Sequence, residues 1–262
     1  PYQLAFARFV LSFGAALFWP LTTAHIGDLV GIEQLGQALM GFNVSWSLGT
    51  IVGPQLGGLL ITWFSIRTPF LVALGVFFFI AMLLLLGTEA NINRSYPKPH
   101  LNENENFVQN DSKAIPLLYT FLSAFASGTL SALFPFYATD LGVSADLIGF
   151  MFLLSGLTQT ITVLLADTLQ FKLGEGKMLL LSPFFLFCSL IMISLTSMIP
   201  ILFVGFAIFG LGFGIAYSTA LFRLMKGSGS RKGKTAGIFE STLGIGFFAG
   251  PFVGGALYQV GD

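Results

Sequence analysis

The segment "GTIVGPQLGG" (residues 49–58) lies in a long uncharged stretch and combines four glycines with one proline. In a helix interior, glycine costs about 1 kcal/mol and proline about 3 kcal/mol relative to alanine. The same pattern, G-x-x-x-G-P-x-x-G-G, returns 197 positions later as "GFFAGPFVGG" (residues 246–255). An unusual helix pattern that occurs twice indicates an internal duplication, with the two copies on equivalent helices.

The composition around these segments indicates a membrane protein. Hydrophobic residues make up 55% of the chain and charged residues 9%, whereas soluble domains carry about 25% charged residues. Crossing the hydrocarbon takes about 20 apolar residues, and backbone groups in lipid must pair internally. The sequence therefore predicts an all-α, polytopic membrane protein with eight spans, near 4–27, 38–62, 69–88, 115–138, 147–166, 178–197, 200–222 and 236–258.

The basic residues predict the orientation of these spans. Ten of the twelve Lys and Arg residues lie in the loops 89–114, 167–177 and 223–235, whereas the opposite loops contain only Arg67. Cytoplasmic loops carry an excess of Lys and Arg. We therefore expect these three loops to be cytoplasmic in an integral protein of the plasma (inner) membrane.

The polar linker 89–114 divides the predicted spans into three and five. Residues 1–88 are then the end of an N-terminal bundle, and residues 115–262 are most of a C-terminal bundle. The duplication becomes symmetric if each half has six spans, so we expect the chain to be truncated, without the first three spans and the last. Duplicated halves around a midplane site are typical of secondary transporters.

Several motifs resemble those of the major facilitator superfamily, whose members are twelve-helix secondary transporters. The two glycine-proline segments resemble the family's antiporter motif, and "ARFVLSFGAA" (7–16) resembles its fourth-helix motif, with Arg8 in place. The loop "GDLVGIEQLGQA" (27–38) keeps Asp28, and "LLADTLQFKLGEGK" (164–177) keeps Asp167. The resemblance implies a two-bundle fold, of which this chain is helices four to eleven, and transport by alternating access.

The repeated glycines predict close helix packing. Small residues four positions apart allow membrane helices to approach closely, and a proline bends a helix and frees a carbonyl. One hypothesis is a tight, kinked contact between the two halves that limits leak and hinges their movement, and the alternative is ordinary helix packing. The residues concerned are Gly49, Gly53, Pro54, Gly57, Gly58, Gly246, Gly250, Pro251, Gly254 and Gly255.

A few polar residues inside the spans are candidates for transport or coupling. Glu240 lies in the last span. Because a carboxylate within the membrane is costly, its presence there suggests a functional role. It could exchange a proton, or it could lie at the membrane surface beside Lys234 or Arg231. The matching position in the first half is Asn43, which with Gln159 is a weaker candidate for lining a cavity. By resemblance Arg8 faces the cavity, although it could instead extend to the outer surface.

These observations favour transport of a small solute by alternating access, with proton-coupled antiport or efflux as the first hypothesis. A symporter or uniporter for a small metabolite is the alternative within transport. A polytopic membrane enzyme or a sensor is the alternative from another class. An enzyme should show His, Asp or Glu clustered near a membrane surface, and a sensor should carry a folded soluble domain, and the sequence indicates neither.

We expect no metal or other cofactor, because Cys188 is alone and the two histidines, His25 and His100, are far apart. The stretch "GSGSRKGKT" (227–235) is similar to a phosphate-binding loop, but Ser228 occupies the position of its first glycine. The expected partners are the lipid bilayer, a small-molecule substrate and protons. We expect no nucleic acid partner and a monomer.

Overall fold

The computed structural model describes residues 32–87, 113–226 and 232–261, together with isolated positions between 6 and 22. These ranges contain helices and turns and no strand, which confirms the all-α prediction. Among the described residues, six helices are long and apolar enough to cross a membrane. They are α3 (Thr68–Gly87), α4 (Ala114–Asp140), α5 (Ala145–Leu164), α7 (Glu175–Leu195), α8 (Ile199–Lys226) and α9 (Lys232–Gly261).

Two further helices complete the described elements. The 32-residue helix α2 (Ile32–Trp63) covers the predicted span 38–62 but is not among these six helices. The short helix α6 (Ala166–Leu173) lies where a loop was predicted over 167–177. It is followed by Gly174, whose φ of 80° is a left-handed value that glycine adopts without a steric penalty. The predicted span 4–27 lies outside the continuously described ranges.

Both copies of the repeated motif are helical. Pro54 lies inside α2 and Pro251 lies inside α9, and each helix continues past its proline. Pro200 is the second residue of α8, a position where a helix tolerates proline because the first backbone N–H groups have no partner within the helix.

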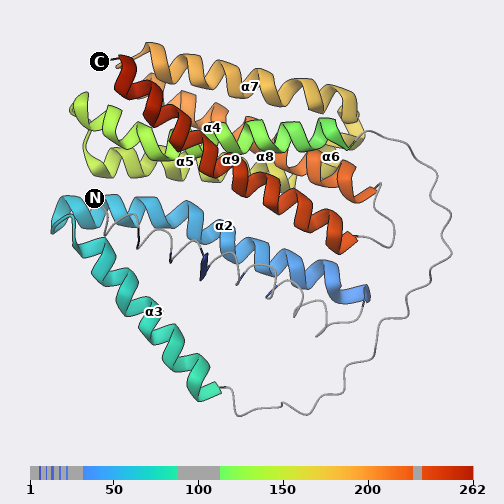
Figure 1. Ribbon diagram of the computed structural model, residues 1–262, viewed down its shortest axis with the longest axis horizontal. Coiled ribbons are helices and arrows are strands. Elements are labelled where there is room, and N and C mark those ends of the chain that lie inside the picture. The colour runs from blue at the N-terminus through green and yellow to red at the C-terminus, as the bar shows by residue number, and fades with distance from the viewer. Residues whose placement is uncertain are drawn as a thin grey trace.

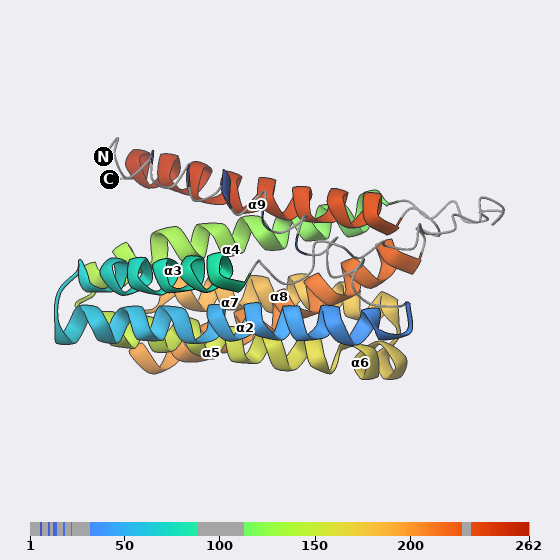
Figure 2. The same cartoon turned by 90° about the horizontal axis from the view of Figure 1, so that it is seen from below.

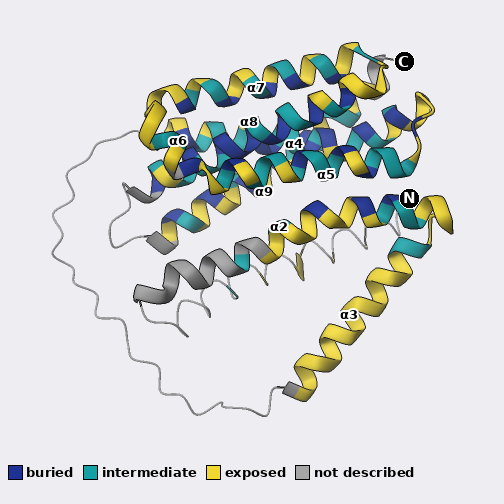
Figure 3. Ribbon diagram, turned by 180° about the vertical axis from the view of Figure 1, so that it is seen from behind, coloured by how far each residue is buried: buried dark blue, intermediate teal, exposed yellow. Residues whose placement is uncertain are grey.

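Helix α8 lies at the centre of a five-helix bundle (Figures 1 and 2), where it packs against α4, α5, α7 and α9. Helix α4 also packs along α9, and α2 packs along α5. Helix α3 diverges from α2 after the turn at 64–67 (Figure 1). Its residues from Phe70 to Leu86 are all exposed (Figure 3). Because these residues are predominantly apolar, they form a surface suited to contact with lipid.

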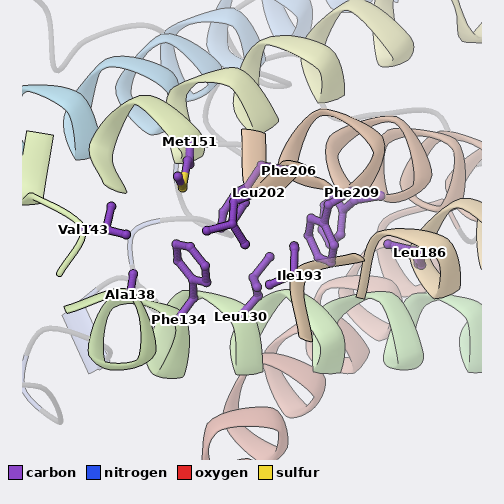
Figure 4. Close-up of a cluster of buried hydrophobic side chains, with 11 residues drawn as sticks. Leu130, Phe134, Ala138, Val143, Met151, Leu186, Ile193, Leu202, Phe206 and Phe209 are labelled. Atoms are coloured by element: carbon purple, nitrogen blue, oxygen red, sulfur yellow. The ribbon is translucent and has the colours of Figure 1, made fainter. Parts of the chain in front are cut away.

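Aromatic and aliphatic side chains from α4, α5, α7 and α8 fill the centre of the bundle (Figure 4). The Phe206 ring lies 4.6 Å from the Phe134 ring and 5.0 Å from the Phe152 ring, in edge-to-face arrangements that aromatic pairs favour. Lipid tails are as apolar as these side chains, so close packing rather than exclusion of water holds the cluster together. The buried members are Leu130, Phe134, Ala138, Val143, Met151, Leu186, Ile193, Leu202, Phe206, Phe209 and Phe213.

Glycines and serines bring α7 and α5 close to α8. Ser189 donates a hydrogen bond of 2.9 Å to the carbonyl of Gly205, and Ser182 donates one of 3.1 Å to that of Gly212. A Cβ atom at Gly214 would lie 2.8 Å from a backbone carbonyl oxygen of α5, closer than real Cβ contacts. Such small-residue contacts are how membrane helices pack without a hydrophobic driving force.

Candidate functional site

Most of the described segments that flank the predicted cytoplasmic loops lie at one end of the bundle, whereas the end of α3, before the loop 89–114, diverges from it. The start of α4, helix α6, the end of α8 and the start of α9 lie together there (Figure 2), and Lys172, Lys177 and Lys234 are exposed. The turns at 64–67, which contains the exposed Arg67, and at 141–144 lie at the opposite end. This alternation agrees with the predicted topology. The parts of the loops at 88–112 and 227–231 lie outside the described residues.

The second copy of the motif packs its glycine face against α4. A Cβ atom at Gly246 would lie 2.7 Å from the Cβ of Ala124, and one at Gly254 would lie 2.7 Å from Cδ1 of Leu133. A Cβ at Gly250 would overlap the carbonyl oxygen of Phe125. These three glycines therefore bring α9 close to α4. The contact lies inside the predicted C-terminal bundle and not between the predicted halves.

The two copies differ in what their glycines contact. Around Gly49, Gly53 and Gly57 no other described side chain or helix would come within 4 Å of an added Cβ atom, and the same holds for Gly255 in the second copy. A Cβ at Gly58, by contrast, would overlap the carbonyl oxygen of Ala145 on α5. In the first copy, therefore, Gly58 is the motif glycine that makes a close contact among the described residues.

Helices α2 and α5 meet along a contact that we call the α2–α5 seam. A Cβ at Gly149 would lie 2.7 Å from the carbonyl oxygen of Pro54, and one at Gly156 would lie 3.0 Å from Cγ1 of Ile51. Near the turns at 64–67 and 141–144, the hydroxyl of Thr62 donates to Oδ1 of Asp146 at 3.5 Å. The seam joins the predicted N-terminal half to the predicted C-terminal half. Its members are Ile51, Pro54, Gln55, Gly58, Thr62, Ala145, Asp146, Gly149 and Gly156.

Gln55 is a polar side chain in this seam that sequence reasoning did not single out. Its exposed fraction is 6%, and neither Oε1 nor Nε2 has a hydrogen-bond partner among the described residues. Its Oε1 lies 3.2 Å from the position that a Cβ of Gly149 would take. In the sequence, Gln55 occupies a variable position of the motif, and the available signal was a polar amide in an otherwise apolar run.

The structure distributes the other candidate residues over several helices. Glu240 on α9 is exposed and follows the buried Phe239, whose ring lies 5.2 Å from that of Tyr217 on α8. Gln159 on α5 is half-buried, and its backbone carbonyl faces Gly214.

The remaining candidates are only partly described. Asn43 lies in α2 and Asp167 in α6, but neither side chain is among those described. Arg8 and Asp28 lie outside the described residues. Within the described ranges, no three His, Cys, Asp or Glu residues group together as a metal site would require.

Comparison with known proteins adds a family to this geometry. A family model described as Major Facilitator Superfamily matches residues 1–251. Multidrug resistance protein 2 of Bacillus subtilis (strain 168) is 25% identical over 97% of this chain and 66% of its own length. The proton-coupled antiporter flippase LtaA of Staphylococcus epidermidis (strain ATCC 12228 / FDA PCI 1200) is 26% identical over 99% of this chain and 65% of its own length.

A third relative covers less of the chain. The multi-drug resistance efflux pump PmrA of Streptococcus pneumoniae (strain ATCC BAA-255 / R6) is 26% identical over 70% of this chain and 47% of its own length. The chain thus spans about two thirds of the length of the first two relatives.

Proposed function

Since this chain belongs to the Major Facilitator Superfamily, we propose that it is the larger part of a proton-coupled antiporter that exports a small solute through the plasma membrane. The observation that carries the proposal is the α2–α5 seam, a contact of glycines and backbone atoms between the two predicted halves. Relatives named as multidrug resistance and proton-coupled antiporter proteins support export and proton coupling. Membership of this family favours transport over the enzyme and sensor alternatives.

The seam supplies a moving part for alternating access. At Gly58 and Gly149 the two helices approach each other through backbone atoms, and at Gly156 the facing atom is Cγ1 of Ile51. The glycines contribute no side chain of their own, so the α5 side of the contact is smooth at these points. Such a contact excludes water when it is closed, and its glycines leave few side chains to be withdrawn when the two helices separate. We propose that residues 1–88 and 115–262 rock about a path near the bilayer midplane, where related transporters bind their substrates.

Glu240 is the proposed carrier of the coupled proton. It lies in the membrane-spanning part of α9, ten residues before the motif's Gly250-Pro251 step, and its side chain is exposed and not packed in the bundle core. A carboxylate in a membrane helix is costly, and in transporters such groups mark ion or proton pathways. Its counterpart in the first half is Asn43, which is also polar.

The test of this role is Glu240→Gln in the full-length protein in everted membrane vesicles. With ethidium as the probe, we expect the variant to lose export driven by a pH gradient while exchange of labelled ethidium at constant pH continues. The amide keeps the shape of the side chain and its hydrogen-bonding ability, but it cannot take up a proton. A variant that still couples ethidium export to the gradient would rule out Glu240, and wild-type transport that ignores the gradient would favour a uniporter.

A further inference from the structure

We propose that Gln55 regulates the opening of the α2–α5 seam, because its buried amide has no hydrogen-bond partner among the described residues when the seam is closed. The inference rests on the proposed function in one respect, namely that the seam opens during transport. It concerns the balance between closed and open seams and not the identity of the substrate or the coupled ion.

The geometry places the Gln55 amide between two backbones. The side chain is 6% exposed, with Oε1 directly over Gly149 of α5, where a Cβ atom would lie 3.2 Å away. Both polar atoms of the amide lack a hydrogen-bond partner among the described residues. A buried polar group without a partner loses the hydrogen bonds that water would provide, and this penalty exceeds the net gain from an ordinary hydrogen bond.

The repeat shows that the motif does not require a polar side chain at this position. The residue that matches Gln55 in the second copy is Phe252, whose exposed fraction is 72%. The apolar Ile51 fills the seam one turn before Gln55 and meets Gly156 without any polar group. An apolar residue at position 55 would therefore keep the helix and the seam while removing the penalty.

Separation of the seam would give the amide access to water and so satisfy both of its polar atoms. An amide without a partner among the described residues thus disfavours the closed seam, and its hydration favours the open seam. Other contacts hold the closed seam, namely the backbone approaches at Gly58 and Gly149 and the hydrogen bond from Thr62 to Asp146. The balance between these opposing effects would let the seam close completely and still reopen.

Two cysteine reporters can measure this balance in membranes, in a Cys188→Ser background of the full-length protein. Thr62→Cys with Asp146→Cys reports the closed seam by the rate of oxidative cross-linking, since these side chains are in contact across it. Ile51→Cys reports the open seam by the rate of labelling with a water-soluble maleimide, since Ile51 is buried at 6% exposure. The ratio of the first rate to the second follows the closed-to-open equilibrium.

Gln55→Met should raise this ratio about tenfold, the change that corresponds to removing one unpaired buried amide. Gly149→Ala should lower the ratio, because its Cβ would lie 2.7 Å from the Pro54 carbonyl oxygen in the closed seam. Phe252→Leu is the matched control in the other copy of the motif, and it should leave the ratio unchanged.

An unchanged or lowered ratio in Gln55→Met would overturn the proposal, provided that Gly149→Ala shifts the ratio and so shows that the reporters respond. Failure of the proposed function would look different. In that case ethidium export would not depend on the pH gradient in wild type, whereas the cross-linking ratio would still respond to Gln55→Met.

Discussion

Gly250→Ala tests whether the second copy of the motif holds α9 against α4. At Gly250 an added Cβ atom would lie 2.8 Å from Oγ1 and 2.9 Å from the backbone nitrogen of Thr129, and it would overlap the carbonyl oxygen of Phe125. Gly255 lies in the same motif copy and the same helix, but no other described side chain or helix comes within 4 Å of its Cβ position. The two substitutions therefore differ mainly in what the new methyl group meets.

The expected magnitude follows from comparing the two alanine variants. Replacing a helical glycine by alanine favours the helix by up to about 1 kcal/mol, and this gain is common to both sites. Forcing an extra methyl group into a packed contact costs about 1–3 kcal/mol. The difference in unfolding free energy between Gly250→Ala and Gly255→Ala is then about 1–3 kcal/mol. At about 2–4 °C per kcal/mol, it corresponds to a Tm difference of about 2–12 °C.

The measurement is thermal unfolding of the full-length protein in detergent, followed by the fraction that remains monodisperse on gel filtration. We expect Gly255→Ala to melt at or above the wild-type temperature and Gly250→Ala to melt below it. Equal melting temperatures for the two variants would refute the packing role of Gly250. Such a result would mean that α4 and α9 yield to the methyl group at little cost.

Two further predictions concern the core and the topology. Phe206→Ala should destabilise the protein by at least about 2 kcal/mol, because Phe206 is 0% exposed and truncating a buried Phe leaves a cavity. Phe136→Ala, at 71% exposure, should leave the Tm of the same gel-filtration assay nearly unchanged. In a Cys188→Ser background, a cysteine at Ser65 should react with an impermeant maleimide added outside intact cells, and one at Lys172 should react only after lysis. Labelling of position 172 from outside would contradict the orientation inferred from charge.

The long helices could be predicted because each lies in an apolar run of membrane-spanning length bounded by polar or proline-containing breaks. The start of α8 next to Pro200 is an example, since the proline marks where one uncharged stretch becomes two helices. Helix α6 was missed. Its eight residues contain Asp167 and Lys172 and no long apolar run, and the helix forms where the chain packs against α7 and α8. Such short helices depend on contacts that a local pattern does not contain.

The candidate site was predicted in part for a similar reason. The spacing of the motif glycines indicated close packing, and Gly246, Gly250 and Gly254 do pack closely. Which helix these glycines contact depends on the arrangement of the bundle. The contacts of Gly149 and Gly156 with α2 depend on it too, and these two glycines belong to no repeated motif. Gln55 became a candidate only when its burial, and the lack of a hydrogen-bond partner among the described residues, were known.

The contrast between α3 and α9 has a consequence for how the protein is made. Helix α3 carries no charge and is exposed from Phe70 to Leu86. Its apolar side chains therefore allow it to insert into the bilayer during synthesis without contacts to other helices. Helix α9 contains Glu240 and Pro251 and many glycines, all of which weaken its own insertion. Its retention in the membrane would then depend on α4, which is synthesised earlier and offers the surface that fits the glycines of α9. In biogenesis, the second copy of the motif would therefore act as a docking face that secures a weakly inserting helix late in synthesis.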